Sequence, residues 1–229
     1  MKEDFNIDNL KSIQLFSGLT DEDFSQLRDR LHVKQFKKNA SILHEEDTNN
    51  YMYIVLSGKV KAIRTTEDGK EIILAMHPAG DFFGEVTLID GQTSPASVIA
   101  TEGSTIAIVA KKDFEAILLS QSKVLRNLLN IFCARLRKSW ETIEILNFNN
   151  ASQRVKMFLL TLTDEYGEKT DKGIMLNIRL THQDMSEMTG LTRETVTRVI
   201  DRLQKDKEII MLKNNRIQLN PSLIMQQMD

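Results

Sequence analysis

The stretch that decides the fold of the C-terminal part is THQDMSEMTGLTRETVTR, residues 181 to 198. It predicts two short helices joined at Gly190. Thr181 and Thr192 are suited to cap the two helices, because a threonine hydroxyl can accept from a free amide of the first turn. Asp184 completes a variant of the capping box at the first helix. A glycine can take the left-handed conformation that ends a helix, and the second helix is expected to reach about Lys205.

The second helix separates its side chains by chemistry. At about 100° per residue, one side is apolar, with Val196, Val199, Ile200 and Leu203. The other side is polar, with Arg193, Glu194, Thr197 and Arg198. Arginine can donate two parallel hydrogen bonds to guanine, and glutamate can accept from the amino group of cytosine. A solvated helix face also contains charges, but the capped helices and the hairpin that follows favour a DNA-binding face.

That hairpin is predicted from two short apolar runs, Ile209 to Leu212 and Arg216 to Leu219, joined by Lys213-Asn214-Asn215. It would form the wing of a winged helix. Thr181-His182-Gln183 and the run from Gly190 to Arg198 resemble the helix-turn-helix of the Crp/Fnr regulators, and the order of parts along nearly the whole chain is also that family's. The resemblance implies a DNA-contact set of Thr181, His182, Gln183, Thr192, Arg193, Glu194, Thr197 and Arg198, with His182 on a phosphate.

The resemblance also implies a target sequence. Arg193 and Arg198 would contact the outer and inner guanines of a TGTGA-like half-site, and Glu194 the cytosine paired with the inner guanine. Fnr-type relatives, which lack an arginine at the position of Arg193, prefer TTGAT.

Composition sets limits on the class of protein. The chain has 229 residues, a net charge of -2 and 41% hydrophobic residues, which are typical of one large or two ordinary globular domains. No apolar run is long enough to span a membrane. The acidic segment Met1 to Asn9 lacks the apolar core of a signal peptide. Cys133, the single cysteine, excludes an intrachain disulfide and a family-type iron–sulfur cluster, and a cytoplasmic location is expected.

The low net charge means that DNA affinity must come from local placement of cations. Arginines and lysines are concentrated within or just after the second helix: Arg193, Arg198, Arg202, Lys205 and Lys207.

The N-terminal part changes its pattern along the chain. Residues from about Asn9 to Leu31 are predicted to be helical, and Ala40 to Val109 contains short strands with glycine turns. Many short strands favour a sandwich or jelly roll. The predicted fold is therefore α+β: a jelly roll of the cyclic-nucleotide-binding type in residues 1–110, a dimerisation helix and hinge in 111–150, and a winged helix-turn-helix in 151–229.

Within the predicted jelly roll, Gly80-Asp81-Phe82-Phe83-Gly84-Glu85-Val86 resembles the start of the family's cyclic-nucleotide cassette. In the family, amides after the glycine bind phosphate and the glutamate accepts from a ribose hydroxyl. The family pattern then has an arginine before a small hydroxyl residue, whereas this chain has Gln92-Thr93-Ser94-Pro95-Ala96. A serine is a poor partner for a phosphate, and proline lacks an amide donor.

We therefore expect an effector other than a cyclic nucleotide, or none. The candidate pocket comprises Gly84, Glu85, Val86, Ser94, Pro95, Ala96, Ser139 and Trp140. The alternative is a cyclic nucleotide-responsive regulator in which another basic group, such as Lys59, Lys61 or Lys138, reaches the phosphate. Glu85 could equally cap a small helix over Glu85 to Ile89. Trp140 is a bulky departure at the family's base-contact position.

The segment from Asp113 to about Asn147 is predicted to be one helix with a heptad seam. The seam is Leu125, Leu129, Phe132, Leu136, Ser139, Ile143 and Leu146. Packing on its own domain is one explanation, but Leu118, Leu119, Leu128 and Ile131 can form the domain-facing side. A parallel coiled coil between two copies is therefore favoured. The expected partners are double-stranded DNA, a second copy of the chain and RNA polymerase.

A third class, a jelly-roll enzyme or interaction module, would need a catalytic or metal-binding cluster. His32, His44, His77 and His182 are too dispersed for a metal site, and a haem ligand would lack a paired motif. No cofactor is expected. His77 is interpreted as a turn residue, and Cys133 as a buried packing thiol rather than a redox switch.

Overall fold

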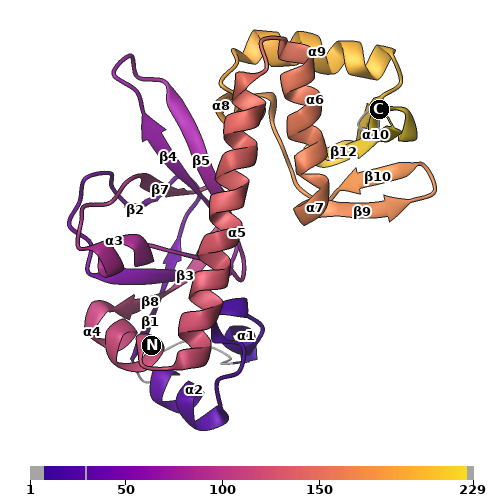
Figure 1. Ribbon diagram of the computed structural model, residues 1–229. Helices are drawn as coiled ribbons and strands as arrows, with labels where there is room; N and C mark the ends of the chain where they lie inside the picture. The colour runs from indigo at the N-terminus through magenta and orange to yellow at the C-terminus, as the bar shows by residue number, and fades with distance from the viewer. Residues whose placement is uncertain (1–7, 29, 226–229) are drawn as a thin grey trace. The chain divides into compact units, whose positions relative to one another are not determined.

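The computed structural model describes residues 8–28 and 30–225 and divides the chain into two compact units, Met1–Arg135 and Leu136–Asp229 (Figure 1). One long helix, α5 (Ser122–Asn147), crosses the boundary between them. The prediction for Met1 to Asn9 falls mainly outside the described residues. In the part of the chain that is described, no helix is long and apolar enough to cross a membrane.

The described residues of the N-terminal unit form a sandwich of two antiparallel four-stranded sheets. The strand orders are β1-β8-β3-β6 and β2-β7-β4-β5. The strands are β1 (Leu31–Phe36), β2 (Ser41–Leu43), β3 (Tyr51–Ser57), β4 (Lys59–Thr65), β5 (Glu71–Pro78), β6 (Phe82–Phe83), β7 (Ser97–Ala100) and β8 (Ser104–Ala110). The predicted jelly-roll class is confirmed. The prediction of helix up to Leu31 is wrong at its end, because Leu31 begins β1 and pairs with Val109 of β8.

The alternation of side chains along β3 shows where the core lies. Met52 and Ile54 belong to a cluster with the N-terminal helices, whereas Tyr53 and Val55 belong to a cluster with the second sheet, including Val98. Successive side chains of a strand point to opposite faces, so β3 is buried on both. This explains why β3 is apolar almost throughout and not alternately polar.

The helices of the N-terminal unit are short, except α5. They are α1 (Asp8–Lys11), α2 (Asp21–Arg28), α3 (Glu85–Asp90) and α4 (Lys111–Asp113), with a π-helical segment over Phe114–Leu119. The predicted single helix from Asp113 is therefore interrupted at Ser120 and Gln121, and α5 begins at Ser122. Val124 and Leu128 of α5 are buried in this unit, which confirms Leu128 as a domain-facing residue.

The C-terminal unit packs helices on a sheet of order β11-β12-β10-β9. Its helices are α6 (Ala151–Thr161), α7 (Thr163–Tyr166), α8 (His182–Thr189), α9 (Arg193–Lys205) and α10 (Pro221–Met225). Its strands are β9 (Gly167–Thr170), β10 (Gly173–Leu176), β11 (Ile209–Met211) and β12 (Ile217–Leu219). The predicted hairpin is confirmed, with Ile209 opposite Leu219. The β9–β10 hairpin was not predicted, because β9 is exposed and polar throughout.

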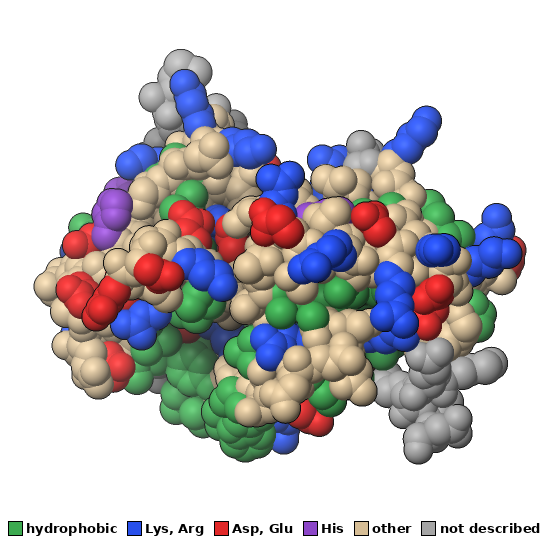
Figure 2. Space-filling view, turned by 90° about the horizontal axis from the view of Figure 1, so that it is seen from above, with side chains coloured by type: hydrophobic (Ala, Val, Ile, Leu, Met, Phe, Trp, Pro, Cys, Tyr) green, Lys and Arg blue, Asp and Glu red, His purple; other side chains and the backbone are tan. Residues whose placement is uncertain are grey.

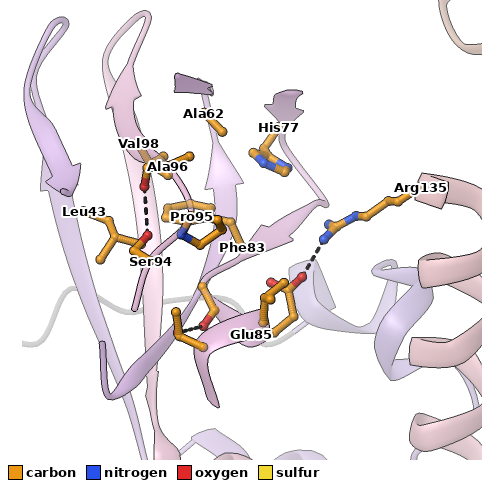
Figure 3. Close-up of a pocket in the computed structure, with 13 residues that line it drawn as sticks. Leu43, Ala62, His77, Phe83, Glu85, Ser94, Pro95, Ala96, Val98 and Arg135 are labelled. Carbon is orange, nitrogen blue, oxygen red and sulfur yellow. Dashed lines mark hydrogen bonds and ion pairs between the residues drawn. The ribbon is translucent and has the colours of Figure 1, made fainter. Parts of the chain in front are cut away.

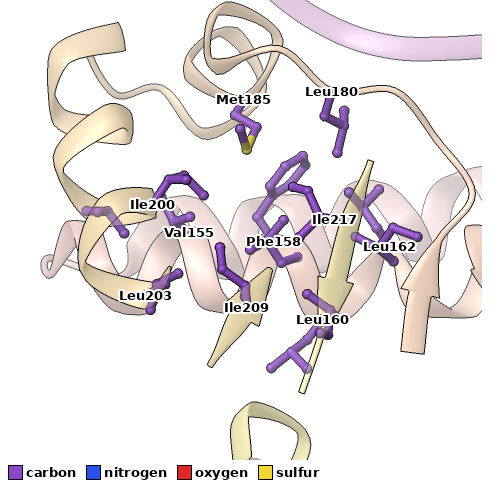
Figure 4. Packing of buried hydrophobic residues seen from close by; sticks show 14 of the residues in the cluster. Val155, Phe158, Leu160, Leu162, Leu180, Met185, Ile200, Leu203, Ile209 and Ile217 are labelled. Atoms are coloured by element: carbon purple, nitrogen blue, oxygen red, sulfur yellow. The ribbon is translucent and has the colours of Figure 1, made fainter. Parts of the chain in front are cut away.

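The core of this unit fixes the position of α9. Val155 and Phe158 of α6, Met185 of α8, Ile200 of α9 and Ile217 of β12 are all buried in one cluster (Figure 4). Because α9 contacts this core along one side, its opposite side remains at the surface.

Candidate nucleic-acid interface and sensor cavity

The two helices from residue 181 to residue 205 have the predicted caps. Thr181 accepts from the amide of Asp184, and the Asp184 carboxylate accepts from the amide of Thr181, so the capping box is complete. Gly190 has a φ of 66°, the left-handed conformation that a glycine adopts without strain. Thr192 accepts from the amide of Thr195 and begins α9. Short local signals therefore determine the angle at which α9 leaves the turn.

The polar face of α9 is accessible. Arg193, Glu194 and Arg198 are exposed and Thr197 is half-buried, whereas Val196 and Ile200 are fully buried. In the space-filling view, Lys and Arg side chains stand out over the surface of the C-terminal unit where α9 lies, with acidic side chains between them (Figure 2). Arg202, farther along, pairs with Asp206 at 3.6 Å. The face therefore presents two guanidinium groups and a carboxylate to solvent.

His182 connects α8 to α9. Its Nδ1 lies 2.8 Å from the Thr197 hydroxyl, and that hydroxyl donates to the carbonyl of Arg193 at 2.9 Å. A hydroxyl has one proton, so Nδ1 is the donor to Thr197 when that hydroxyl donates to Arg193. Gln183, another predicted DNA contact, donates to Glu187 at 2.7 Å.

The second candidate site is a cavity of about 120 Å³ inside the N-terminal unit (Figure 3). Its lining includes the predicted pocket residues Gly84, Glu85, Val86, Ser94, Pro95 and Ala96. Its apolar walls come from Leu43, Ala62, Phe83 and Val98. Ser139 and Trp140 lie farther along α5 in the C-terminal unit and stay predictions.

The cassette loop is tightly packed at Gly84. Its φ is 82°, and an added Cβ would lie 2.8 Å from the carbonyl oxygen of Tyr51, so only glycine fits there. The buried Asn49 amide donates to the Gly84 carbonyl at 3.0 Å and to the Thr87 hydroxyl at 3.0 Å. These contacts position Glu85 at the start of α3. The N-cap residue of α3 is Gly84, which has no side chain, so the interpretation of Glu85 as a structural cap stays a prediction.

Glu85 is paired instead with an arginine of α5. Arg135 donates to Oε1 of Glu85, to Oδ1 of Asp81 and to the carbonyl of Phe82, each at 2.7 Å. Its guanidinium also lies 4.6 Å from the centre of the Phe82 ring. In Figure 3 the Glu85 and Arg135 side chains point toward each other. One arginine thus ties the cassette to α5.

Sequence reasoning missed Arg135, although a signal was present. Val124, Leu128 and Ile131 face the sandwich at helical spacing, and the next position of that series is 135. The alternative in which a lysine reaches a phosphate bound in this cavity receives no support from Lys61 and Lys138, because each pairs with a glutamate. Lys61 pairs with Glu71 at 2.9 Å, and Lys138 pairs with Glu165.

His77 completes the network on the other side of Asp81. Its Nδ1 lies 2.7 Å from Oδ2 of Asp81, and its side chain is buried in β5. The interpretation of His77 as a turn residue is therefore wrong, because β5 extends to Pro78. Burial opposes ionisation of Asp81, but the hydrogen bond and charge of His77 and the charge of Arg135 outweigh it and lower the pKa of Asp81.

Glu85 behaves in the opposite way. Its side chain is 1% exposed, and burial raises its pKa above the ordinary value although Arg135 opposes the shift. Oε1 accepts from Arg135, but Oε2 is buried without a hydrogen-bond partner among the described residues.

The seam of α5 is largely exposed in the single chain. Leu125, Leu129, Leu136, Ile143 and Leu146 are between 41% and 57% exposed, and Phe132 is half-buried. Trp140, beside the seam, is 59% exposed. The interpretation of Cys133 as a buried thiol is wrong, since it lies one position beyond Phe132 and is exposed. Among the described residues no group of histidine, cysteine and carboxylate side chains could bind a metal ion.

A strand sandwich with this cassette, a long helix and a capped helix-turn-helix with an exposed polar face define a class of protein, a sensor-type domain joined to a DNA-binding domain. Residues 33–121 match the family model of the cyclic nucleotide-binding domain, and residues 153–221 match that of the Crp-like helix-turn-helix domain. The chain belongs to the Crp/Fnr family of DNA-binding transcriptional regulators, and it is not an enzyme.

Similar proteins match the chain over both its N-terminal and its C-terminal part. The cyclic AMP receptor protein of Thermus thermophilus is 29% identical over 197 residues, which cover 86% of this chain and 88% of that protein. The global nitrogen regulator of Synechococcus elongatus is 28% identical over 199 residues, with coverages of 86% and 90%. The structure of a CooA mutant from Carboxydothermus hydrogenoformans has the same fold, with a TM-score of 0.81, 23% identity and coverages of 96% and 97%.

Proposed function

We propose that the protein acts as a homodimer that binds a TGTGA-like palindrome, with an effector other than a cyclic nucleotide or with none. The observation that supports this most is the exposed face of α9. Arg193 and Arg198 offer guanidinium groups for two guanines, and Glu194 offers an acceptor for a cytosine. The Fnr-type alternative, TTGAT, lacks a role for Arg193.

The seam of α5 supports the dimer. Five large aliphatic side chains at heptad spacing are 41% or more exposed in one chain. A second copy would bury them as a coiled coil, as the spacing favours. Two copies of α9 would then enter successive major grooves about 34 Å apart, so the two half-sites should form an inverted repeat. RNA polymerase is the partner expected of such a regulator, in the cytoplasm.

The cavity supports an effector other than a cyclic nucleotide. Ser94 and Pro95 lie in its wall where the family pattern has an arginine, and Arg135 is already engaged with Asp81 and Glu85. A cyclic phosphate in this position would lose its hydration without a dedicated cation. The relative from Thermus thermophilus is a cyclic AMP receptor protein, so cyclic AMP is the direct comparison.

Fluorescence anisotropy with defined duplexes tests both parts. A duplex with inverted TGTGA half-sites should bind without any added nucleotide, and more tightly than one with TTGAT half-sites. Cyclic AMP and cyclic GMP, titrated by calorimetry and in the anisotropy assay, should bind weakly or leave DNA affinity unchanged. Tight nucleotide binding with a large gain in DNA affinity would overturn the effector proposal. A preference for TTGAT would overturn the proposed half-site.

A further inference from the structure

Thr197 lies around α9 between the two arginines that are proposed to contact guanines. From Arg193, the helix turns by about 40° to reach Thr197 and by about 140° to reach Arg198. Arg193 and Arg198 are exposed and Thr197 is half-buried, so all three reach the accessible face of the helix. A base that lies between the outer and the inner guanine would therefore meet Thr197. In a TGTGA half-site that base is a thymine.

The hydroxyl of Thr197 is already bonded within the protein. It donates to the carbonyl of Arg193 at 2.9 Å, and Nδ1 of His182 lies 2.8 Å from the same oxygen. A hydroxyl has only one proton, and the carbonyl of Arg193 accepts it. A thymine presents an acceptor, O4, and a methyl group in the major groove. The Thr197 hydroxyl therefore has no proton left for O4 of a thymine.

The γ-methyl group is the part of Thr197 that remains for a contact with this base. The methyl group and the hydroxyl are both attached to Cβ, so the contacts that hold the hydroxyl also fix the direction of the methyl group. A threonine methyl group can form an apolar contact with the methyl group of thymine. Uracil lacks that methyl group and cannot form the contact.

We propose that the γ-methyl group of Thr197 recognises the methyl group of the thymine between the two guanines, so that Thr197 specifies a base through an apolar contact. This role of Thr197 rests on the proposed function, from which the TGTGA half-site and the positions of Arg193 and Arg198 are taken. It assigns a contact to the central base pair, for which neither arginine accounts.

Fluorescence anisotropy on the full-length protein tests the contact at the level of one methyl group. One duplex has inverted TGTGA half-sites. The matched duplex has deoxyuridine in place of the central thymine of one half-site, which removes the methyl group and keeps the hydrogen-bonding groups of the base. The wild type should bind the deoxyuridine duplex about fourfold more weakly, the factor that corresponds to burial of one methyl-sized group.

Thr197→Ser is the corresponding change in the protein, because it removes the methyl group and keeps the hydroxyl that contacts Arg193 and His182. This variant should bind the thymine duplex about fourfold more weakly than the wild type does, and it should bind the thymine and deoxyuridine duplexes equally. Thr195→Ser is the matched control, since it loses the same group at a position about 160° away around α9. It should keep the preference of the wild type for thymine.

Two results would overturn the proposal. The first is equal affinity of the wild type for the thymine and deoxyuridine duplexes. The second is a preference for thymine that persists in Thr197→Ser, because such a preference would come from the DNA itself or from another side chain.

Duplexes with substituted guanines separate this proposal from the proposed function. If substitution of the guanines weakens binding but deoxyuridine does not, only the role of Thr197 is wrong. If substitution of both guanines leaves the affinity unchanged, the TGTGA half-site itself is wrong, and the role of Thr197 is wrong with it.

Discussion

Arg193, Glu194 and Arg198 lie within six residues of one another on α9, and all three are exposed. The polar groups of the cavity come from separate segments, and Asp81 and Arg135, which bond directly, are 54 positions apart in the chain. The groups on α9 are ready to bond to an external partner, whereas those in the cavity bond mostly to each other. The DNA-binding face therefore depends on one local motif, which the proposed dimer would present twice, while the sensor depends on the topology of the sandwich.

The largest expected effect comes from separating the two copies of the chain that would each present α9 to DNA. Leu136→Glu should split the dimer, because a buried unpaired charge costs about 3 kcal/mol or more. Binding to the palindrome should fall with it. Light scattering and anisotropy measure the two effects. Ala134→Glu, at an exposed position on the opposite side of α5, is the matched control and should remain a dimer. If Leu136→Glu keeps the mass of a dimer, the seam is not the interface.

A smaller effect tests whether α9 specifies sequence by single side chains. Arg193→Ala should cost about 1–3 kcal/mol in DNA binding and relax only the outer guanine. Arg202→Ala, farther along the same helix, should instead weaken binding to all sequences alike. The readout is the affinity for duplexes substituted at one base pair at a time. Relaxation at the inner guanine would show that the proposed assignment of Arg193 is wrong.

The cavity network should respond to pH through Asp81. Because the pKa of Asp81 is lowered in the folded state, its ionised carboxylate stabilises the fold at pH values above the ordinary pKa of an aspartate. This stabilisation is lost as the pH falls through the pKa that Asp81 has in the folded state. Asp81→Asn should therefore lower the free energy of unfolding at pH 7 by about 1–3 kcal/mol, and the difference from the wild type should shrink below about pH 4. Urea denaturation at both pH values measures this. The control is Glu67→Gln, at an exposed turn position, and a constant deficit for Asp81→Asn would contradict the account.

The smallest effect is expected at the edge of the DNA-binding face. His182 pairs with Thr197 of α9 and is expected to contact a phosphate. His182→Ala should thus reduce affinity by about 1 kcal/mol or less for any sequence. Anisotropy with duplexes of different sequence measures this, and a loss that depends on one base pair would show that His182 contacts a base instead.

The same contrast explains what could be predicted from the sequence. Thr181, Gly190 and Thr192 act on their immediate neighbours, so the caps and the turn of the helix-turn-helix could be predicted. The sandwich class could be predicted from short apolar runs and glycine turns, whereas the order of the strands in its two sheets was not predicted. Arg135 was missed because its partners Asp81 and Glu85 are distant in sequence, and β1 and β9 were missed because neither has a clear apolar alternation. His77 was misinterpreted because Pro78 suggested a turn within a strand.

In the proposed mechanism, the exposed face of α9, presented twice by a dimer, selects DNA without a cyclic nucleotide. Selection of bound duplexes from random DNA by the purified protein, with no ligand added, is the sharpest test of this mechanism. We expect recovery of an inverted repeat of TGTGA-like half-sites about one helical turn apart, and the same consensus when cyclic AMP is present. Recovery of TTGAT half-sites, or of a consensus only when cyclic AMP is added, would show that the mechanism is wrong.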